Sequence, residues 1–184
     1  MAHGQSRLSR LVLPVGGRDH VLGPADAPTT LVEYGDYECP YCGLAHPIVK
    51  EVLHRMGPRV RFAFRNFPLA EMHPHALRAA EAAEAAGAQG KFWQMHDTLY
   101  EHQRALDEPD LLRYAERIGL DHTRFLTELS EHAWEARVRE DFMTGVRSGV
   151  NGTPTFFVNG IRHDGPWDAE ALVAALLASS RRPA

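Results

Sequence analysis

The hydrophobic positions of the chain predict two short regions that mix strands and helices, separated by a long helical region. An apolar, β-prone run at residues 30–35 predicts a strand, and residues 45–56 follow it with the spacing of a helix. Apolar and polar positions then alternate over residues 60–65, which is the period of a strand. Because Arg61 and Arg65 occupy the second face of that strand, we expect this face to be partly solvated. The order β-α-β favours parallel strands joined by the helix.

After the second strand, helical spacing dominates a long stretch of the chain. Residues 75–86 are rich in alanine and end near Gly87, and several shorter apolar stripes follow. Asp110 and Asp121 are suitable N-caps for two of these shorter helices. We therefore predict an all-helical insertion at residues 71–149.

Strand signals return near the end of the chain. Residues 155–158 and 161–163 flank Asn159-Gly160, a pair that commonly forms the turn of a β-hairpin. Asp168 precedes an apolar stripe and is expected to cap a last helix. The order of this final region is therefore β-β-α.

These elements predict an α/β fold whose β-α-β and β-β-α halves are separated by the all-helical insertion. The α/β domain is expected to comprise residues 25–70 and 150–184, with residues 71–149 as the insertion. Residues 1–24 are expected to form an N-terminal arm. A Gly-Gly pair inside this arm predicts a small hairpin whose second strand is residues 20–22.

Length and charge limit the classes of function. A chain of 184 residues suits one domain with a sizeable core. The 20 basic and 24 acidic residues give a net charge of −4, which offers no basic surface for nucleic acid. No apolar run approaches the ~18 residues of a membrane-spanning helix. We therefore expect neither nucleic acid nor membrane as a partner.

The N-terminal residues do not resemble a secretory signal. Their apolar stretch is shorter than the about 7–15 residues of such a signal, and no small-residue cleavage site follows. Taken as written, the sequence predicts a cytoplasmic protein. In a reducing compartment, a lone pair of thiols is more typical of catalysis or metal binding than of a permanent disulfide.

The only two cysteines, Cys39 and Cys42, are separated by two residues at the start of the first predicted helix. A Cys-x-x-Cys motif between a strand and a helix is typical of a redox site. The helix N-terminus favours a thiolate, and in such motifs the cysteine pKa is lowered to roughly 3.5–7.5. We therefore assign nucleophilic attack to Cys39 and resolution to Cys42, which lies one turn deeper. Pro40 suits the first helical turn, where its missing N–H is not needed.

A zinc half-site is the alternative interpretation of the cysteine pair. Structural zinc generally takes four ligands, and the chain has no second Cys-x-x-Cys motif. The 11 histidines are scattered, with His73 and His75 as the only close pair. The adjacent His96 and Asp97 are expected at a helix surface. We therefore expect no metal ion and no bound cofactor.

Two motifs and their placement resemble a known family. The chain carries Cys39-Pro40-Tyr41-Cys42 after a predicted strand, then a helical insertion, then Gly152-Thr153-Pro154-Thr155 before the late hairpin. Flanking phrases match at residues 23–28, 35–39, 73–75 and 90–93. Over roughly residues 18–178, the sequence resembles the DsbA-like branch of the thioredoxin superfamily, including domains fused to some sodium/proton antiporters.

The resemblance implies a thioredoxin-like fold and a thiol–disulfide oxidoreductase that acts on protein or peptide thiols without a bound cofactor. It makes Cys39 the exposed nucleophile and Cys42 the buried resolving thiol. It also makes Pro154 a cis-proline packed against the disulfide, preceded by Thr153. Glu33, six positions before Cys39, matches a carboxylate that the family buries beneath its active site.

Each implied residue has an expected chemical role. The backbone of Thr153 is expected to pair with an incoming peptide, and its hydroxyl to hydrogen-bond the Cys39 sulfur. If Glu33 is buried without a cation its pKa should be raised, so that it can take the proton of the resolving thiol through water. Pro40 and Tyr41 are expected to line a shallow substrate groove together with Thr153 and Pro154.

The direction of electron flow is left open by the sequence. Tyr41 cannot place the positive charge that a histidine would, so we expect a site less oxidising than that of relatives with Cys-Pro-His-Cys. The recycling partner is expected to be a thiol of the thioredoxin or glutathione system. Two other functions also remain: a glutathione-dependent isomerase or transferase on a DsbA-like scaffold, and a non-catalytic metal-binding or holdase module.

Overall fold

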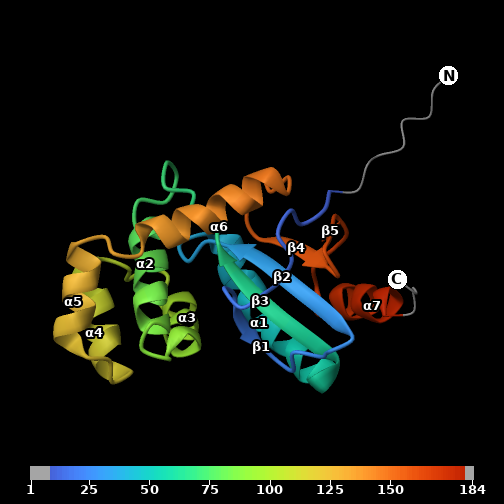
Figure 1. Cartoon of the computed structure of the whole chain (residues 1–184), viewed down its shortest axis with the longest axis horizontal. Coiled ribbons are helices and arrows are strands. Elements are labelled where there is room, and N and C mark those ends of the chain that lie inside the picture. Colours follow the sequence, from blue (N-terminus) through green and yellow to red (C-terminus); the bar gives the residue numbers. More distant parts are fainter. Residues whose placement is uncertain (1–8, 181–184) are drawn as a thin grey trace.

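A five-stranded mixed sheet runs through the molecule in the order β1-β3-β2-β4-β5 (Figure 1). The computed structural model describes residues 9–180 of the chain. Strands β2 and β3 are parallel, as the β-α-β order predicted, and β4 lies antiparallel on the other side of β2. The strands are His20–Leu22 (β1), Thr29–Gly35 (β2), Val60–Asn66 (β3), Thr155–Val158 (β4) and Ile161–His163 (β5).

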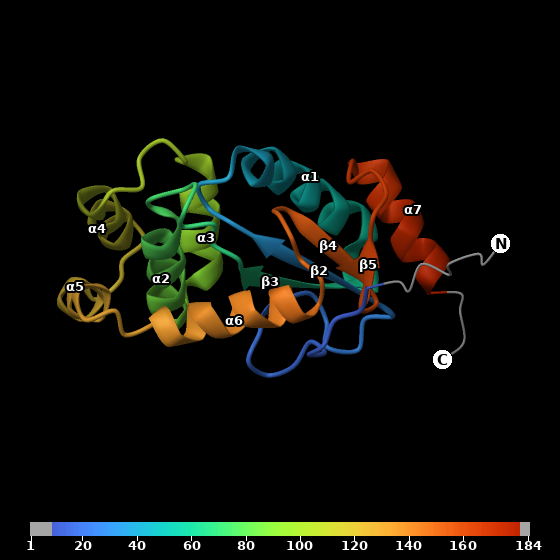
Figure 2. The same cartoon turned by 90° about the horizontal axis from the view of Figure 1, so that it is seen from above.

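Helices cover both faces of this sheet (Figure 2). On one face lie α1 (Pro40–Met56) and α7 (Ala169–Ser179), which pack against each other. On the other face α6 (Glu135–Arg147) packs on β3, next to the N-terminal segment. Because both faces are covered, the central strands β2 and β3 are buried over nearly their whole length.

The remaining helices form a bundle beyond one end of the sheet (Figure 1). The helices are α2 (Ala76–Gly87), α3 (Phe92–Glu101), α4 (Glu108–Arg117) and α5 (His122–Ser130), and a 3-10 turn at Gly57–Arg59 links α1 to β3. Helix α2 is the centre of the bundle and contacts each of the helices α3 to α6. Its small alanine side chains are almost completely buried, which lets the neighbouring helices approach closely.

The α/β fold with a helical insertion is confirmed, because α2 to α6 all fall between the two halves of the sheet. The structure differs from the prediction in the N-terminal arm. The predicted hairpin in the N-terminal arm is wrong: His20–Leu22 joins the sheet as its edge strand, antiparallel to β3. Arg10 forms an isolated bridge with Ile161 at the opposite edge. Residues 1–8 of the predicted arm lie outside the described residues.

The second face of β3 is solvated only in part: Arg61 is half-buried, as expected, whereas the expectation is wrong at Arg65. Arg65 is fully buried, because the N-terminal segment folds over this face. Its guanidinium donates to both carboxylate oxygens of Asp19, to the backbone carbonyls of Leu13 and Pro14, and to the hydroxyl of Tyr34. A charge with this many partners can be buried at moderate cost.

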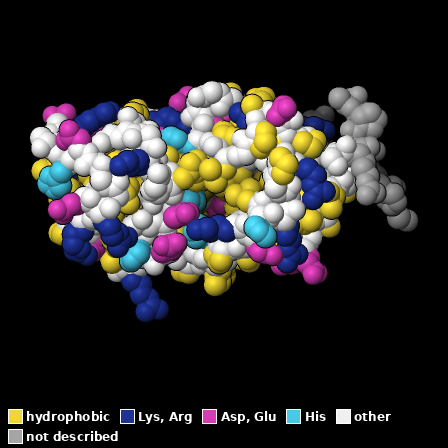
Figure 3. Space-filling view, turned by 90° about the horizontal axis from the view of Figure 1, so that it is seen from below, with side chains coloured by type: hydrophobic (Ala, Val, Ile, Leu, Met, Phe, Trp, Pro, Cys, Tyr) yellow, Lys and Arg dark blue, Asp and Glu magenta, His cyan; other side chains and the backbone are white. Residues whose placement is uncertain are grey.

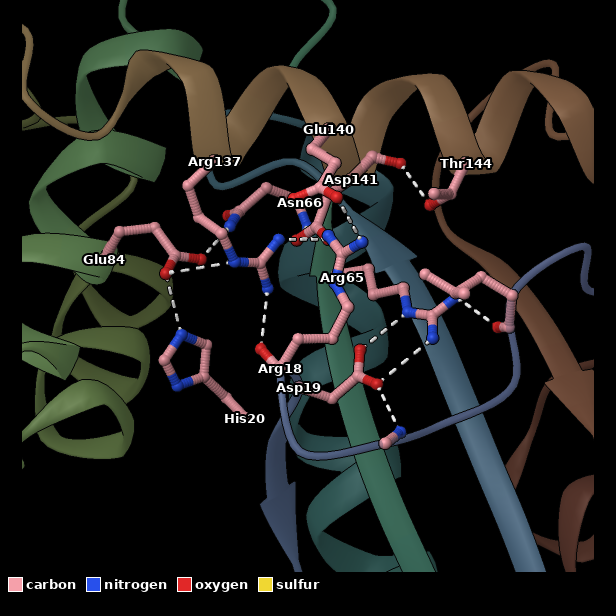
Figure 4. A network of polar contacts seen from close by, with 12 residues as sticks. Arg18, Asp19, His20, Arg65, Asn66, Glu84, Arg137, Glu140, Asp141 and Thr144 are labelled. Carbon is pink, nitrogen blue, oxygen red and sulfur yellow. Dashed lines mark hydrogen bonds and ion pairs between the residues drawn. The ribbon is translucent and has the colours of Figure 1, made fainter.

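Polar contacts, most of them buried, extend from the surroundings of Arg65 into the insertion (Figure 4). The network includes Arg18 with Glu140 and Asp141, Arg137 with Asp141, His20 with Glu84, and Asn66 with Glu84 and Asp141. These contacts join the N-terminal segment and β3 to helices α2 and α6. The insertion is therefore fixed to the sheet by polar contacts as well as by apolar packing.

The surface carries charges of both signs. On the face seen in Figure 3, hydrophobic side chains gather near the middle and charged side chains lie around them. Among residues 9–180, no helix combines the length and the apolar character needed to cross a bilayer.

Candidate active site

The two cysteines lie at the N-terminus of α1, directly after the loop that leaves β2. Cys39 is the N-cap residue with extended backbone angles, and Pro40 occupies the first helical position. Cys39 is only 4% exposed, so the expectation of an exposed nucleophile is wrong, whereas Cys42 is fully buried as expected. The two cysteine side chains approach to 3.8 Å without a disulfide bond. The two side chains are therefore close enough to interact.

The environment separates the two thiols chemically. A hydrogen bond with the Cys42 side chain lowers the pKa of Cys39 to about 5, helped by Thr153 and the N–H groups of Tyr41 and Cys42, and opposed by burial. Burial raises the pKa of Cys42 well above its usual value, and its hydrogen bond to Cys39 and the charge of Glu33 act in the same direction. At neutral pH Cys39 is therefore a thiolate and Cys42 a thiol.

The segment before β4 closes the site from the other side. The Thr153-Pro154 peptide bond is cis. In the thiol form, Cys39 Sγ donates to the carbonyl oxygen of Thr153 at 3.4 Å, whereas the buried Thr153 hydroxyl has no partner among the described residues. The sequence predicted that the hydroxyl would bind the sulfur. Because a hydroxyl rotates freely, it is available to the sulfur once that atom is charged.

Glu33 lies in β2 beneath the cysteines and is 2% exposed. Its Oε1 has no hydrogen-bond partner among residues 9–180. Burial, and secondarily the charge of Cys39, raises the pKa of Glu33 to about 8. The carboxyl group is therefore mostly protonated at neutral pH and titrates close to it.

Asp36 organises the loop between β2 and α1, a role that sequence reasoning missed. This fully buried carboxylate accepts hydrogen bonds from the backbone N–H groups of Glu38 and Leu69 and from the His73 ring. Its own N–H lies 3.5 Å from Cys42 Sγ. A turn residue three positions before a Cys-x-x-Cys motif was the available sequence signal.

Two histidines attach the segment after β3 to the same loop. His73 Nδ1 lies 2.8 Å from Asp36 Oδ2, and His75 Nδ1 lies 2.8 Å from Glu38 Oε1. Burial lowers the pKa of His73, but its hydrogen bond to Asp36 and the nearby negative charges outweigh this, so the pKa is raised overall. This histidine pair therefore has a structural role at the edge of the site.

Gln103, from the loop after α3, contacts the first turn of α1. Its Nε2 donates to the carbonyl oxygens of Tyr37 and Cys39 at 2.8 and 2.9 Å. Gly43 leaves room for it, because a Cβ atom there would lie 2.0 Å from Gln103 Oε1. No sequence pattern pointed to Gln103, since it lies more than sixty residues from its partners.

A groove runs beside the cysteines between α1 and the Gln103 loop. It is lined by Glu38, Pro40, Gly43, Leu44, Gln103 and Arg104. The side chains of Tyr41 and Leu44 are 63% and 61% exposed nearby on α1. The structure thus brings the predicted residues Glu33, Cys39, Cys42 and Thr153 together, while Tyr41 points its ring toward solvent.

Two groups of side chains in the described part of the chain come close enough to hold a metal ion. One comprises His46, His96 and Asp97, and the other Glu81, His132 and Glu135. His96 is 4% exposed, so the expectation that it lies at a helix surface is wrong. Neither group includes the cysteines.

Known proteins resemble this chain in sequence and in structure. A family model described as thioredoxin matches residues 16–178. The sequence is 52% identical over 170 residues to a Na(+)/H(+) antiporter NhaA 3 of Salinispora tropica, which is 92% of this chain and 26% of that protein. It is 48% identical over 169 residues to an NhaA 1 antiporter of Mycobacterium sp. strain KMS, which is 90% of this chain and 28% of that protein. The chain spans about a quarter of the length of these relatives.

Solved structures share the fold over about nine-tenths of the chain. A thioredoxin-like oxidoreductase from Silicibacter pomeroyi has a TM-score of 0.81 and 28% identity, covering 91% of this chain and 95% of that one. BdbD from Bacillus subtilis has a TM-score of 0.80 and 23% identity, covering 90% and 94%. Wolbachia pipientis alpha-DsbA1 has a TM-score of 0.77 and 19% identity, covering 92% and 94%, and these last two matches support the fold alone. The chain therefore belongs to the thioredoxin family.

Proposed function

We propose that the protein is a thiol–disulfide oxidoreductase that exchanges disulfides with protein or peptide thiols. The observation that carries this proposal is the contrast between the two sulfurs: a Cys39 pKa lowered to about 5, beside a buried Cys42 whose pKa is raised. Disulfide exchange needs a thiolate for attack and a second thiol that is released for attack only later. The family membership and the oxidoreductase named among the structural relatives support the same chemistry.

The reductive half-reaction begins at Cys39. Its thiolate attacks one sulfur of a substrate disulfide, forming a mixed disulfide and releasing the other substrate sulfur as a thiolate. Cys42 then loses its proton and attacks Cys39 Sγ, which closes the Cys39–Cys42 disulfide and releases the second substrate thiol. Two electrons pass from the protein to the substrate, and the oxidative direction is the reverse.

Glu33 is the acceptor that we assign to the proton of Cys42. The carboxyl group is buried, its Oε1 is unpaired, and its pKa of about 8 lies near that of a thiol in water. A base with a pKa close to the operating pH is efficient in proton transfer. We place water between the two groups, which gives the proton a path during resolution.

The substrate is assigned to the surface formed by Pro40, Tyr41, Thr153 and Pro154. The exposed Tyr41 ring supplies apolar contact area, and the Thr153 backbone supplies a strand-like edge for a peptide. A thiol of the thioredoxin or glutathione system would return the site to its starting redox state. The antiporter activity in the curated names belongs to proteins about four times as long as this chain, and we do not extend it to the chain.

Substitution of each cysteine tests the proposal. With a disulfide-containing peptide as substrate, Cys39→Ser is expected to abolish exchange, whereas Cys42→Ser is expected to accumulate a mixed disulfide visible by mass spectrometry. Exchange that persists in Cys39→Ser would refute the proposed function.

The same variants separate the two alternatives. A glutathione-dependent isomerase or transferase would keep its activity in Cys42→Ser and saturate with glutathione. A holdase would suppress aggregation of a client protein even without both thiols. A titration of the disulfide in glutathione buffers then measures the potential, which we expect to be less oxidising than that of Cys-Pro-His-Cys relatives because Tyr41 is uncharged.

A further inference from the structure

A cluster of potential ligands lies between the redox helix and the insertion. His46 belongs to α1, and His96 and Asp97 belong to α3. One ligand atom from each residue lies within 4.8 Å of the other two. His46 Nε2 is 3.4 Å from Asp97 Oδ1. The cluster is separate from the cysteines, which carry the proposed activity.

One ring nitrogen of His46 lacks a hydrogen-bond partner among residues 9–180. The residue is 8% exposed, and its buried Nε2 makes no hydrogen bond within the described part of the chain, despite its proximity to Asp97. Buried polar atoms almost always have a partner, and leaving one unpaired costs about 1–3 kcal/mol. An unpaired imidazole nitrogen that faces a carboxylate oxygen therefore indicates a missing ligand.

His96 is held in the way that metal-binding histidines are held. Its Nδ1 lies 3.0 Å from the Tyr37 hydroxyl, and both groups are buried. Histidine ligands generally direct one ring nitrogen to the metal and bond the other to a polar group, which fixes the ring. The contact with Tyr37 leaves Nε2 of His96 for a metal.

The charged groups around the three side chains have both signs. Asp97 is 41% exposed at its side chain and gives the site access to solvent. Lys50 opposes a cation: its Nζ lies 3.1 Å from Asp97 Oδ2. That ammonium group is half-exposed, and it also lies 3.9 Å from Glu101.

We propose that His46, His96 and Asp97 form a binding site for one divalent transition-metal ion of the Zn²⁺ type. Two imidazole nitrogens and one carboxylate oxygen form a donor set that zinc prefers, and the solvent side of Asp97 leaves room for a water ligand. The proposal departs from the sequence-based expectation of no metal. The bound ion would link α1, which carries the cysteines, to α3 of the insertion.

The second cluster, Glu81, His132 and Glu135, gives no comparable support for a metal site. His132 and Glu135 are exposed, and Glu81 already pairs with Arg78. It therefore serves as a comparison in the experiment.

Zinc titration of the oxidised 184-residue chain tests the site. The disulfide form is used because it removes both thiols as competing ligands, so the result is independent of the proposed oxidoreductase activity. Isothermal titration with Zn²⁺ is expected to give one ion per chain. Asp97→Asn, at a half-exposed position that should not affect folding, and His46→Gln are each expected to weaken binding by about tenfold or more. Tyr37→Phe is expected to weaken it by about tenfold through loss of the outer hydrogen bond.

Two matched variants serve as controls. His54→Gln removes an exposed histidine from the same helix α1, and His132→Gln removes the histidine of the second cluster. Both are expected to bind Zn²⁺ like the unaltered protein. The proposal is overturned if the oxidised protein binds no Zn²⁺, if binding survives both Asp97→Asn and His46→Gln, or if it is lost in His132→Gln.

Discussion

At the scale of single residues, the site works through differences between neighbouring groups. Cys39 and Cys42 have the same side chain, but one sulfur meets hydrogen-bond donors at a helix start and the other lies in the core. Glu33 has an ordinary carboxyl group whose pKa is raised mainly by burial and secondarily by the charge of Cys39. Local environment, rather than residue type, therefore decides the protonation state of each group.

The thiolate at Cys39 depends first on Cys42. Substitution Cys42→Ala removes the hydrogen bond that contributes most to the lowered pKa of Cys39. A hydrogen bond to a charged group contributes about 1.5–3 kcal/mol, so alkylation of Cys39 at pH 5 is expected to slow by about tenfold. The measurement is the rate of iodoacetamide reaction against pH. An unchanged midpoint in Cys42→Ala would assign the shift to the helix N-terminus instead.

Glu33 should make stability fall as pH rises. Its pKa is raised from 4.5 to about 8 in the folded protein, so folding favours the protonated carboxyl. The stabilisation is complete below pH 4.5 and is lost as pH rises through 8. In the oxidised protein the thiols do not titrate and the charge of Cys39 is absent, so burial alone raises the pKa of Glu33, and Glu33→Gln is expected to raise the free energy of unfolding by up to about 3 kcal/mol at pH 7.

Urea unfolding at several pH values measures this effect. At pH 4 the Glu33→Gln variant should differ little from the unaltered protein, because the carboxyl is then neutral in both states. Glu71→Gln, at an exposed position, is the matched control and should show no such pH dependence. A pH-independent gain for Glu33→Gln would contradict the raised pKa.

At the scale of elements, the insertion positions the first turn of α1. Gln103, in the loop after α3, bonds two carbonyl oxygens that flank the active-site loop. Loss of both bonds leaves those oxygens without this donor. The insertion thus acts on the cysteines through the backbone of the turn that holds them.

Gly43 and Gln103 should be energetically coupled. Gly43→Ala places a methyl group against Gln103 Oε1 and should destabilise the protein, although alanine is favoured over glycine by about 1 kcal/mol inside a helix. Gln103→Ala alone is expected to cost about 1–3 kcal/mol. In the double variant, the methyl group has space, so Gly43→Ala should become neutral or stabilising. Additive losses in a double-mutant cycle would show that the two side chains do not interact.

At the scale of the whole molecule, a buried ion pair fixes the N-terminal segment to the sheet. Arg65 and Asp19 are both completely buried, and Arg65 Nε donates to Asp19 Oδ1 at 2.8 Å. The pKa of Asp19 is lowered: burial raises it, but the hydrogen bonds and charge of Arg65 outweigh burial. This contribution to stability is therefore present at neutral pH and is lost as pH falls through the folded pKa of Asp19.

Removal of one partner should be costly because it leaves a buried charge. Arg65→Met is expected to lower the free energy of unfolding by about 3–5 kcal/mol, whereas Asp19→Leu with Arg65→Met should lose less than the two single changes combined. Arg55→Met, which breaks an exposed pair with Glu51, is the control and should cost about 0.5 kcal/mol or less. Denaturant unfolding of the unaltered protein, the two single variants, the double variant and the Arg55→Met control is the measurement. An Arg65→Met variant as stable as the control would contradict the role of the pair.

Local patterns in the sequence determined the elements and the chemistry at their ends. Strand periodicity, the alanine-rich helix, the Asn159-Gly160 turn and the Cys39–Cys42 spacing each depend on residues close together in the chain, so their structural consequences are local. The thiolate at the start of α1 is of this kind, because its largest stabilising contact comes from Cys42, three residues along the chain, and the nearby backbone N–H groups of the helix N-terminus add to it.

The contacts between residues that lie far apart in the sequence became visible only in the tertiary structure. The N-terminal segment covers Arg65, Gln103 reaches the redox helix, and His46 and His96 face each other although fifty positions separate them. Burial and contact between distant residues depend on how elements pack, and a periodic pattern in one segment carries no record of its neighbours. For this reason the sequence predicted the cysteine chemistry, while the buried charge, the contact with the insertion and the proposed metal site required the fold.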